Sequence, residues 1–385
     1  MNLSVGIVGL PNVGKSTLFN ALLKKQTAFV ANYPFATIEP NIGIVPVPDI
    51  RLERLAQITK EEEKMDGFPP IKPATVNFVD IAGLVKGASE GAGLGNKFLS
   101  HIREVSIVCH VVRAFEDPDI IRYQDEKEAR LPAPERSDGG QGSVDPKSDY
   151  QTIQTELILA DLQSVVNAQS KVKRFAIESE KTAIEKLYKG LNGGKQAAEI
   201  ILTPEEQEYA KTFFLLSGKP EIMVLNVAES DYSESKIEEI TQKYAELLGV
   251  SSQKLVVVSA KIEADLAELS VEEQKQYLVD LGIKQSGLER LIQKAYSTLG
   301  LISFLTSGAK EVRAWTIRLG DTSLMASGTI HTDFMKKFIK AEVVAYEEFV
   351  KNNGWKKSRE LGKARMEGRD YIMQDGDVVE FKIGA

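Results

Sequence analysis

The chain has 385 residues, 43% of them hydrophobic, and a formal net charge of −7. This length and composition indicate a soluble globular protein of about two or three domains with ordinary hydrophobic cores. A single cysteine excludes a disulfide framework, and the lack of a long apolar run excludes a membrane-spanning helix, so we expect a cytoplasmic protein with no membrane partner.

The motif at residues 9–17 is the most informative stretch of the chain. It reads Gly-Leu-Pro-Asn-Val-Gly-Lys-Ser-Thr, follows a short apolar run and precedes a helix-like segment. Gly9 and Gly14 let the backbone curl, so that its N–H groups and the positive end of the following helix form a cradle for phosphate oxygens. In this P-loop pattern Lys15 reaches the β- and γ-phosphates and Ser16 holds Mg²⁺. The spacing predicts a nucleoside triphosphate site.

Two loops after the P-loop are predicted to sense the γ-phosphate. Thr37 lies in a proline-punctuated loop at residues 32–41, where the threonine hydroxyl of a nucleotide switch closes over Mg²⁺ and the γ-phosphate. The second loop, at residues 83–95, contains five glycines and precedes a helix-like segment. Its position behind the P-loop strands favours a switch over a plain linker.

The strand-like pattern at residues 74–79 delivers the next candidate residues to the carboxyl edge of a predicted sheet, where ligands of open α/β sheets bind. Asp80 fits the acidic residue that holds magnesium through a bound water, and Gly83 would offer its N–H to the γ-phosphate. Leu84 follows, and a leucine cannot orient an attacking water as the glutamine of Ras-type switches does. Hydrolysis must then rely on another group, a bound ion or a partner.

Residues 150–216 are predicted to form a helical insertion. After a polar tract at 126–149 that is rich in proline and glycine, apolar residues recur at helical spacing from Tyr150 onward. Glycines interrupt the pattern at residues 190–194, and Pro204 opens another helix. We expect an antiparallel helical hairpin, which is either a coiled-coil arm for partners or a plain structural insertion.

Two later strand ends are predicted to read the base. One strand pattern ends in Asn-Val-Ala-Glu at residues 226–229, and the next ends in Ser-Ala-Lys at 259–261. GTPases carry Asn-Lys-x-Asp at the first of these positions, where the Asp accepts two hydrogen bonds from guanine and the Lys stem covers the ring. Here Val227 replaces the Lys, and Glu229, one methylene longer, replaces the Asp. A site that does not pair guanine's donors loses a discrimination of roughly 10⁴-fold, so adenine is the favoured base.

The tail from residue 302 is predicted to be a small α+β module. Strand-rich sequence at 309–319 precedes a predicted helix at 333–351 and two further strands at 371–373 and 378–381. Basic residues recur between Lys356 and Arg369, and this run is either a solvated face or an RNA-facing patch.

With these motifs established, the chain resembles the YchF, or Obg-like ATPase, family of translation-factor-class P-loop proteins over nearly its whole length. The tail sequence at residues 328–334 resembles the TGS module, a β-grasp fold. The motifs that carry the family resemblance are residues 9–17, 34–41, 80–84, 91–95 and 226–229.

The resemblance implies a fold and a division into domains. The expected fold is α/β, with a P-loop NTPase domain whose mostly parallel sheet is flanked by helices, an inserted antiparallel helical coiled-coil arm, and a C-terminal α+β TGS domain. The expected boundaries are 1–301 for the Obg-type nucleotide-binding domain, with the insertion at about 150–216, and 302–385 for the TGS domain.

The resemblance also implies roles for individual residues. Lys15 and Gly83 are the expected catalytic positions, and the group that positions water is unidentified, because Arg122 stands where the family often has a histidine. Magnesium is expected at Ser16 and Thr37, with Asp80 acting behind them. The residues expected to bind the nucleotide are Asn12, Val13, Gly14, Lys15, Ser16 and Thr17 at the phosphates, and Asn226, Val227, Glu229, Ser259, Ala260 and Lys261 around the base.

The leading functional hypothesis is a Mg²⁺-dependent ATPase that prefers ATP to GTP and acts as a nucleotide-dependent switch on ribosomes. We expect a monomer that contacts the ribosome through the helical arm and the TGS domain, with a monovalent cation such as K⁺ as a further candidate cofactor. Two alternatives remain open: an ATP-gated ribosome- or RNA-binding module with negligible hydrolysis, and a conventional GTPase.

Overall fold

The computed structural model describes residues 3–31, 41–81, 94–117, 144–171 and 177–384. Their contacts divide the chain into two compact units. Unit 1 consists of residues 1–44 and 77–291, and unit 2 consists of residues 45–76 and 292–385. No helix of the described part is both long enough and apolar enough to cross a membrane.

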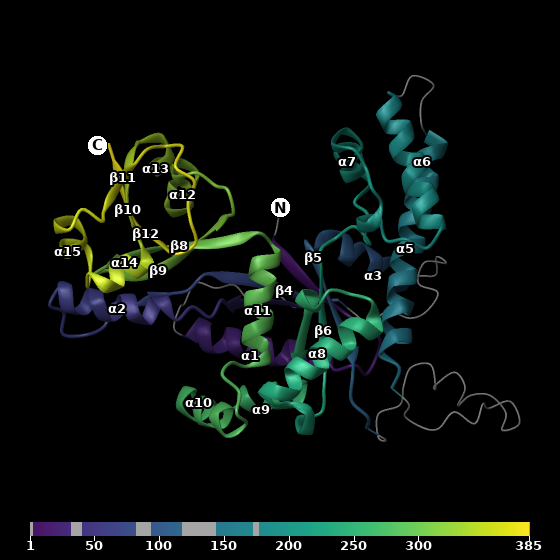
Figure 1. The fold of residues 1–385 in the computed structure, drawn as a ribbon, viewed down its shortest axis with the longest axis horizontal. Coiled ribbons are helices and arrows are strands. Elements are labelled where there is room, and N and C mark those ends of the chain that lie inside the picture. Colours follow the sequence, from purple (N-terminus) through teal and green to yellow (C-terminus); the bar gives the residue numbers. More distant parts are fainter. Residues whose placement is uncertain (1–2, 32–40, 82–93, 118–143, 172–176, 385) are drawn as a thin grey trace, which may run out of the picture. The chain divides into compact units, whose positions relative to one another are not determined.

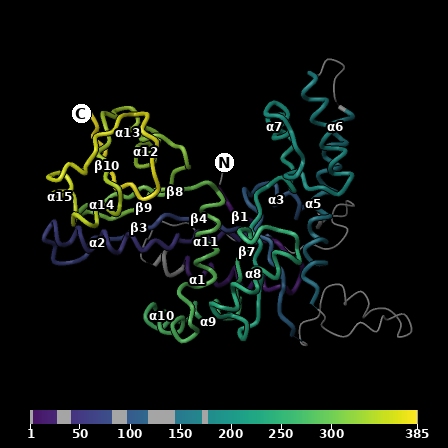
Figure 2. The backbone as a smooth tube through the Cα atoms, in the orientation of Figure 1, coloured from purple at the N-terminus to yellow at the C-terminus, as the bar shows by residue number. Residues whose placement is uncertain are grey.

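Unit 1 contains a six-stranded sheet in the order β2-β4-β1-β5-β6-β7 (Figures 1 and 2). All four pairings from β4 through β1, β5 and β6 to β7 are parallel. Every residue of β1, β5 and β7 is buried, as expected for a parallel sheet covered on both faces. The predicted mostly parallel α/β sheet is therefore confirmed. Its strands are β1 (Ser4–Val8), β2 (Ile42–Pro46), β4 (Thr75–Asp80), β5 (Ile107–Arg113), β6 (Glu221–Asn226) and β7 (Leu255–Val258).

The helices of this part of the chain follow the strands along the sequence, which is the pattern of a doubly wound sheet. The first, α1, starts at Lys15, directly after the P-loop glycine. The last, α11, continues across the division between the two units. They are α1 (Lys15–Ala31), α3 (Leu94–Glu104), α5 (Pro146–Lys171), α6 (Glu178–Asn192), α7 (Pro204–Ala210), α8 (Glu234–Leu248), α9 (Ala260–Leu266), α10 (Val271–Asp280) and α11 (Gly287–Thr298).

A helical insertion is present, but its hairpin differs from the predicted one: α5 and α6, which lie side by side in Figure 1, both begin before the glycines at 190–194 where the turn was expected, and the helix that Pro204 opens is the short α7. Its first helix begins at Pro146, slightly before the expected start at Tyr150. The two helices share one apolar cluster, to which residues of α7 add. The buried members of that cluster are Ile158, Val165, Ile184, Leu187 and Leu191.

A buried carboxylate, Asp161, fixes α5 to the segment that returns to the sheet. Asp161 is fully buried and accepts hydrogen bonds from Leu216 N at 2.7 Å, from Ser217 N at 2.8 Å and from Ser217 Oγ at 2.6 Å. Burial raises the pKa of Asp161, and the three donors oppose this shift. The arm is thus joined to the sheet at a defined position.

Unit 2 contains a second six-stranded sheet, in the order β11-β10-β12-β8-β9-β3. It mixes antiparallel pairs, such as β8 with β9, and parallel pairs, such as β12 with β8, and helices accompany it. The predicted α+β character of the tail is confirmed. The strands are β3 (Ile71–Lys72), β8 (Leu301–Gly308), β9 (Glu311–Arg318), β10 (Phe338–Ala345), β11 (Arg365–Glu367) and β12 (Asp377–Ile383). The helices are α2 (Arg51–Glu62), α12 (Ser323–Ile330), α13 (Thr332–Lys336), α14 (Tyr346–Lys351) and α15 (Trp355–Glu360).

Residues 45–76 join the C-terminal unit, which differs from the predicted boundary between residues 301 and 302. Helix α2 packs its apolar face against β8 and β9, and β3 pairs in parallel with β9. Polar contacts support this packing: Thr59 Oγ1 lies 2.6 Å from Ser307 Oγ, and Arg51 Nη1 lies 2.8 Å from Asp375 Oδ2. Residues 45–76 thus add an edge strand to the second sheet and a helix that packs on it. Local sequence patterns do not reveal this contact between distant parts of the chain.

The prediction of a helix at residues 333–351 was wrong for the central part of that range. Only α13 and α14 are helical there, and the residues between them form β10. This strand pairs along its length with β12, from Phe338 opposite Ile383 to Ala345 opposite Asp377. The long-range pairing and the burial of Ala341 and Val343 in the core of unit 2 outweigh the local helical pattern.

Replacing Asp161 tests the anchor of the arm. Asp161→Ala leaves three buried donors without their acceptor, at about 1–3 kcal/mol for each unsatisfied group, so we expect the free energy of unfolding to fall by at least about 2 kcal/mol. Urea denaturation of the purified variant measures this.

The control is Glu208→Ala, which removes an exposed pair with Lys211 in the same region, where the two side chains are 75% and 72% exposed. An exposed pair contributes about 0–1 kcal/mol. Equal shifts in the two variants would contradict the anchoring role of Asp161.

Candidate functional site

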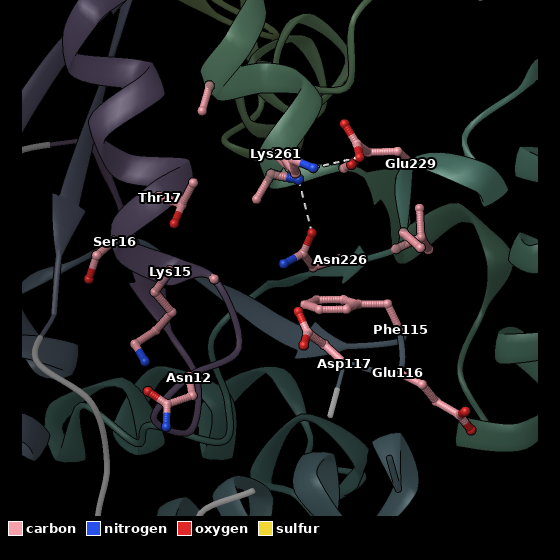
Figure 3. A pocket seen from close by; sticks show the side chains of 16 residues that line it. Asn12, Lys15, Ser16, Thr17, Phe115, Glu116, Asp117, Asn226, Glu229 and Lys261 are labelled. Atoms are coloured by element: carbon pink, nitrogen blue, oxygen red, sulfur yellow. Dashed lines mark hydrogen bonds and ion pairs between the residues drawn. The ribbon is translucent and has the colours of Figure 1, made fainter. Parts of the chain in front are cut away.

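A pocket of about 830 Å³ lies in unit 1, at the loops that follow β1, β5, β6 and β7 (Figure 3). Because these strands are parallel, their carboxyl ends meet at one edge of the sheet. The pocket brings together every predicted nucleotide-binding residue except Val13, whose backbone lies next to it. The lining residues are Asn12, Gly14, Lys15, Ser16, Thr17, Phe115, Glu116, Asp117, Asn226, Val227, Ala228, Glu229, Ser259, Ala260, Lys261 and Ala264.

The P-loop has a backbone that only certain residues can adopt. Asn12 has φ 63° and Gly14 has φ 96°, both in the left-handed region. A Cβ atom on Gly14 would lie 2.3 Å from the side-chain nitrogen of Asn226, closer than any real contact. Gly14 is therefore required both for the turn and for the close approach of Asn226.

Asn226, the last residue of β6, is buried and joins two loops of the pocket. Its Nδ2 donates to the carbonyl of Val13 at 3.0 Å, and its Oδ1 accepts from the N–H of Ala260 at 2.9 Å. Figure 3 shows the second of these bonds as a dashed line. The sequence predicted Asn226 near the base, and in the structure its amide holds the P-loop to the start of α9.

Lys15 lies at the end of the pocket where the sequence predicts the phosphates and is only 8% exposed. Its Nζ donates to the Leu10 carbonyl at 2.6 Å. Burial lowers the pKa of Lys15 to about 8, and the nearby Asp80 carboxylate acts in the opposite direction. Burial likewise raises the pKa of Asp80, which ends β4 opposite Ile7. Lys15 and Asp80, which the sequence predicted separately as site residues, thus lie close enough to influence each other electrostatically.

The oxygen atoms near the P-loop fit a magnesium ion that is shared with phosphate. Ser16 is exposed in the pocket, and Asp80 supplies a carboxylate close enough to influence Lys15. Mg²⁺ uses hard oxygen ligands, needs only one or two from the protein and takes the others from phosphate and water. Among the described residues no group of three or more histidine, cysteine or acidic side chains could hold a metal by itself. Thr37, Gly83 and Leu84 lie outside the described residues.

The end of the pocket where the sequence predicts the base is formed by the residues after β6 and β7. Glu229 begins a short 3₁₀ helix, η5 (Glu229–Asp231), and its Oε2 lies 2.7 Å from Nζ of Lys261. Val227 is 3% exposed and belongs to the hydrophobic core of unit 1. The hydroxyl of Ser259 is buried and has no hydrogen-bond partner among the described residues. The pocket therefore offers an ion pair and a free hydroxyl at this end.

Sequence reasoning missed the residues after β5. Phe115, Glu116 and Asp117 line the pocket, and Figure 3 shows the Phe115 ring beside the Asn226 side chain. Arg113 fixes this loop, because its guanidinium donates to the carbonyls of Phe115 and Asp117 at 3.0 Å each and lies 4.8 Å from the Phe115 ring centre. The signal in the sequence was the position of Phe115 just after a buried parallel strand.

Two family models match separate parts of the chain. The one described as "50S ribosome-binding GTPase" matches residues 4–133. The YchF-GTPase_C model, described as "Protein of unknown function (DUF933)", matches residues 301–384.

Curated relatives match the chain over its length. Proteins named "Ribosome-binding ATPase YchF" from Bacillus subtilis and Haemophilus influenzae are 43% and 44% identical over 388 residues, with 99% of both chains covered in each case. The chain belongs to the YchF family. A solved structure described as the Schizosaccharomyces pombe YchF GTPase agrees, with 34% identity, a TM-score of 0.80 and coverage of 99% of this chain and 98% of that chain.

Membership of the YchF family confirms the resemblance predicted from the motifs. It also gives this chain a P-loop NTPase domain in front of a YchF-type C-terminal region. The names of the relatives differ in the nucleotide, since the bacterial proteins are called ATPases and the yeast structure a GTPase. The base preference of this chain has to be argued from its own pocket.

Replacing Gly14 tests the close approach of the P-loop to Asn226. Gly14→Ala combines a left-handed backbone, which costs an L-residue about 1–2 kcal/mol, with a clash at 2.3 Å. We expect ATP affinity to fall at least about tenfold, measured with a fluorescent ATP analogue. Gly194→Ala is the matched control, because Gly194 also has a left-handed φ of 79° but no atom lies within 4 Å of its Cβ position. ATP binding that survives in both variants would contradict the argument.

The lowered pKa of Lys15 predicts a pH dependence of nucleotide binding. The free protein loses the proton of Lys15 as pH rises through about 8. Triphosphate favours the charged lysine, so binding above this pH takes up a proton, and ATP affinity should fall by up to about tenfold per pH unit.

Isothermal titration at pH 7 to 9.5 measures this dependence. Lys15→Arg is the control, because its guanidinium stays charged throughout, so its ATP affinity, although weaker, should not change over the same range. A wild-type affinity that stays constant to pH 9.5 would show that Lys15 does not titrate there.

Proposed function

We propose that this chain is a Mg²⁺-dependent ATPase that hydrolyses ATP in preference to GTP and uses its nucleotide state to control association with ribosomes. The observation that carries the proposal is the single pocket in which the P-loop and the two base-reading strand ends meet. Its volume of about 830 Å³ lies within the range of about 300–1,000 Å³ that is usual for small-molecule sites.

The phosphate end supports binding of a triphosphate. Asn12 to Thr17 surround the start of α1, whose positive end attracts anions, and Lys15 adds a buried charge. We assign Ser16 and Thr37 to the magnesium ion and Asp80 to its bound water. Lys15 and the Gly83 N–H are the proposed catalytic groups, and K⁺ is a further candidate cofactor next to the phosphates.

The base end supports adenine. The carboxylate that would accept guanine's two donors is Glu229, and it is already paired with Lys261. Phe115, held by Arg113, presents an aromatic ring on which a purine can stack. We assign Asn226, Val227, Glu229, Ser259, Ala260 and Lys261 to the surroundings of the base.

The ribosome is the proposed partner because the bacterial relatives are named ribosome-binding ATPases and because the chain carries a helical arm beside its nucleotide domain. The C-terminal unit, which we assign to the TGS type, is the second proposed contact. Part of its basic run is neutralised within the unit, since Arg359 pairs with Glu342 and Glu380. Lys356 and Lys357 are exposed and have no ion pair in the described part of the chain, so they are the better candidates for RNA phosphates. We propose a cytoplasmic monomer.

Slow hydrolysis without a partner is part of the proposal. Leu84 cannot orient a water molecule, so the free protein should turn over slowly and ribosomes should accelerate it. The γ-phosphate would then act on the loops that contain Thr37 and Gly83 and report the nucleotide state to the arm.

The test is a titration of the purified full chain with ATP and GTP, with Mg²⁺ and with EDTA, followed by phosphate release with and without ribosomes. We expect tighter binding of ATP than of GTP, weaker binding in EDTA and faster turnover with ribosomes. Lys15→Ala is the control, because it removes the charge from the phosphate cradle and should abolish tight binding of both nucleotides.

The alternatives predict different results in the same experiment. Tighter binding of GTP would identify a conventional GTPase. Tight ATP binding with turnover near zero, unchanged by ribosomes, would identify a binding module that uses ATP only for ordering. Unchanged nucleotide affinity in Lys15→Ala would reject the P-loop site itself.

A further inference from the structure

At the base end of the pocket, Lys261 and Glu229 form an ion pair. Nζ of Lys261 lies 2.7 Å from Oε2 of Glu229, and Figure 3 shows the pair at the edge of the pocket above Asn226. The side chains are 72% and 43% exposed, so an incoming base can reach both. The hydrogen bond to Glu229 raises the pKa of Lys261 and keeps its amine charged.

The backbones that carry the pair are fixed by buried contacts. Glu229 follows β6 and Lys261 follows β7, which are neighbouring parallel strands with Asn226 opposite Val258. A buried hydrogen bond of 3.2 Å between the Tyr232 hydroxyl and Glu263 Oε1 joins the same two segments a second time. The ion pair therefore forms between two fixed points of the backbone, so little backbone conformational entropy is lost when it forms.

The pair changes what Glu229 can offer to a purine. A free carboxylate presents two acceptors, which complement the adjacent N1–H and 2-amino donors of guanine. With one oxygen held by Lys261, the pair presents an N–H donor beside a single acceptor. Adenine carries an acceptor, N1, beside its 6-amino donor, so the pair matches adenine's edge and leaves a guanine donor without a partner. A polar group left unpaired in a binding site is a strong source of discrimination.

We propose that Lys261 is a specificity-determining residue that selects adenine over guanine by occupying the carboxylate of Glu229. The inference rests on the proposed nucleotide site and names the group that sets its substrate class. It differs from selection by Glu229 alone, because it predicts that the longer carboxylate at this position can accept guanine once its lysine partner is removed.

The decisive variant is Lys261→Met, which keeps an unbranched stem of similar length and removes the donor and its charge. We expect GTP affinity to rise and ATP affinity to fall, so that the GTP/ATP affinity ratio increases about tenfold or more, equal to about 1.4 kcal/mol. ITP lacks the 2-amino group and offers only N1–H, so its gain should be smaller than that of GTP. The three dissociation constants are measured by competition against one fluorescent nucleotide.

Lys236→Met is the matched control. Lys236 pairs with Asp231 at 2.9 Å, at the other end of η5, with side chains 47% and 45% exposed, and does not line the pocket. Like Lys261→Met, it removes one positive charge that pairs with an acidic residue of η5, so it accounts for any general effect of charge on an anionic ligand. Its GTP/ATP ratio should equal that of the wild type.

Glu229→Gln tests whether a GTP gain requires a free carboxylate at residue 229 or only the loss of the ion pair. It also breaks the ion pair but leaves no carboxylate, so GTP should not gain, and the double variant Lys261→Met/Glu229→Gln should show no gain either. The three substituted positions are solvent-exposed, and thermal melting confirms that each of the four variants is folded.

The results distinguish this inference from the proposed function. If wild-type protein binds neither nucleotide, the nucleotide site fails. If wild-type protein prefers ATP but the ratio in Lys261→Met stays within twofold of that in Lys236→Met, the site stands and the role of Lys261 is refuted. A GTP gain that persists in the double variant would also refute it, because no carboxylate would remain to accept guanine.

Discussion

The pocket depends on one buried amide. Asn226 donates to the P-loop at the Val13 carbonyl and accepts from Ala260 at the start of α9, so a single side chain sets the distance between the phosphate end and the base end. Both of its bonds are buried, and each partner left without it would be an unsatisfied backbone group costing about 1–3 kcal/mol. Because Asn226 ends β6, the sheet itself determines where the two halves of a nucleotide can lie.

Two lysines of the pocket are in opposite electrostatic states. Lys15 is buried, its amine donates to the neutral carbonyl of Leu10 and to no other group in the described ranges of the chain, and its pKa is lowered to about 8. Burying a cation is unfavourable, the nearby Asp80 carboxylate offsets only part of that cost, and a bound phosphate would offset more of it. Lys261 is exposed and already has its anion, Glu229. The free protein is thus prepared for an anion at the P-loop, whereas at the base end it offers a paired donor and acceptor.

The sequence motifs predicted many of the residues that line the pocket, because the signal there is contiguous. The P-loop, Asp80 and the strand ends at Asn226 and Ser259 lie in short motifs, and parallel strands bring such ends to one edge. Phe115 escaped prediction because its orientation depends on Arg113, two residues earlier, and on no recognisable motif. The packing of residues 45–76 with the C-terminal unit and the strand character of β10 depend on pairing between distant segments, which overrides local patterns.

An exposed ion pair contributes about 0–1 kcal/mol when its side chains are free to move. For the proposed discrimination between purines, Lys261 and Glu229 therefore need a rigid support. A buried polar cluster behind them supplies it. Glu263 accepts from the Gly287 N–H at 2.6 Å and from the Tyr232 hydroxyl, and Arg290 donates to the same hydroxyl at 3.2 Å and to the Val257 carbonyl at 2.9 Å. These bonds join Tyr232, the residue that follows η5, to β7, α9 and α11. Because this ordering is present before a nucleotide binds, the backbone positions of Lys261 and Glu229 need no further ordering for the proposed discrimination between bases.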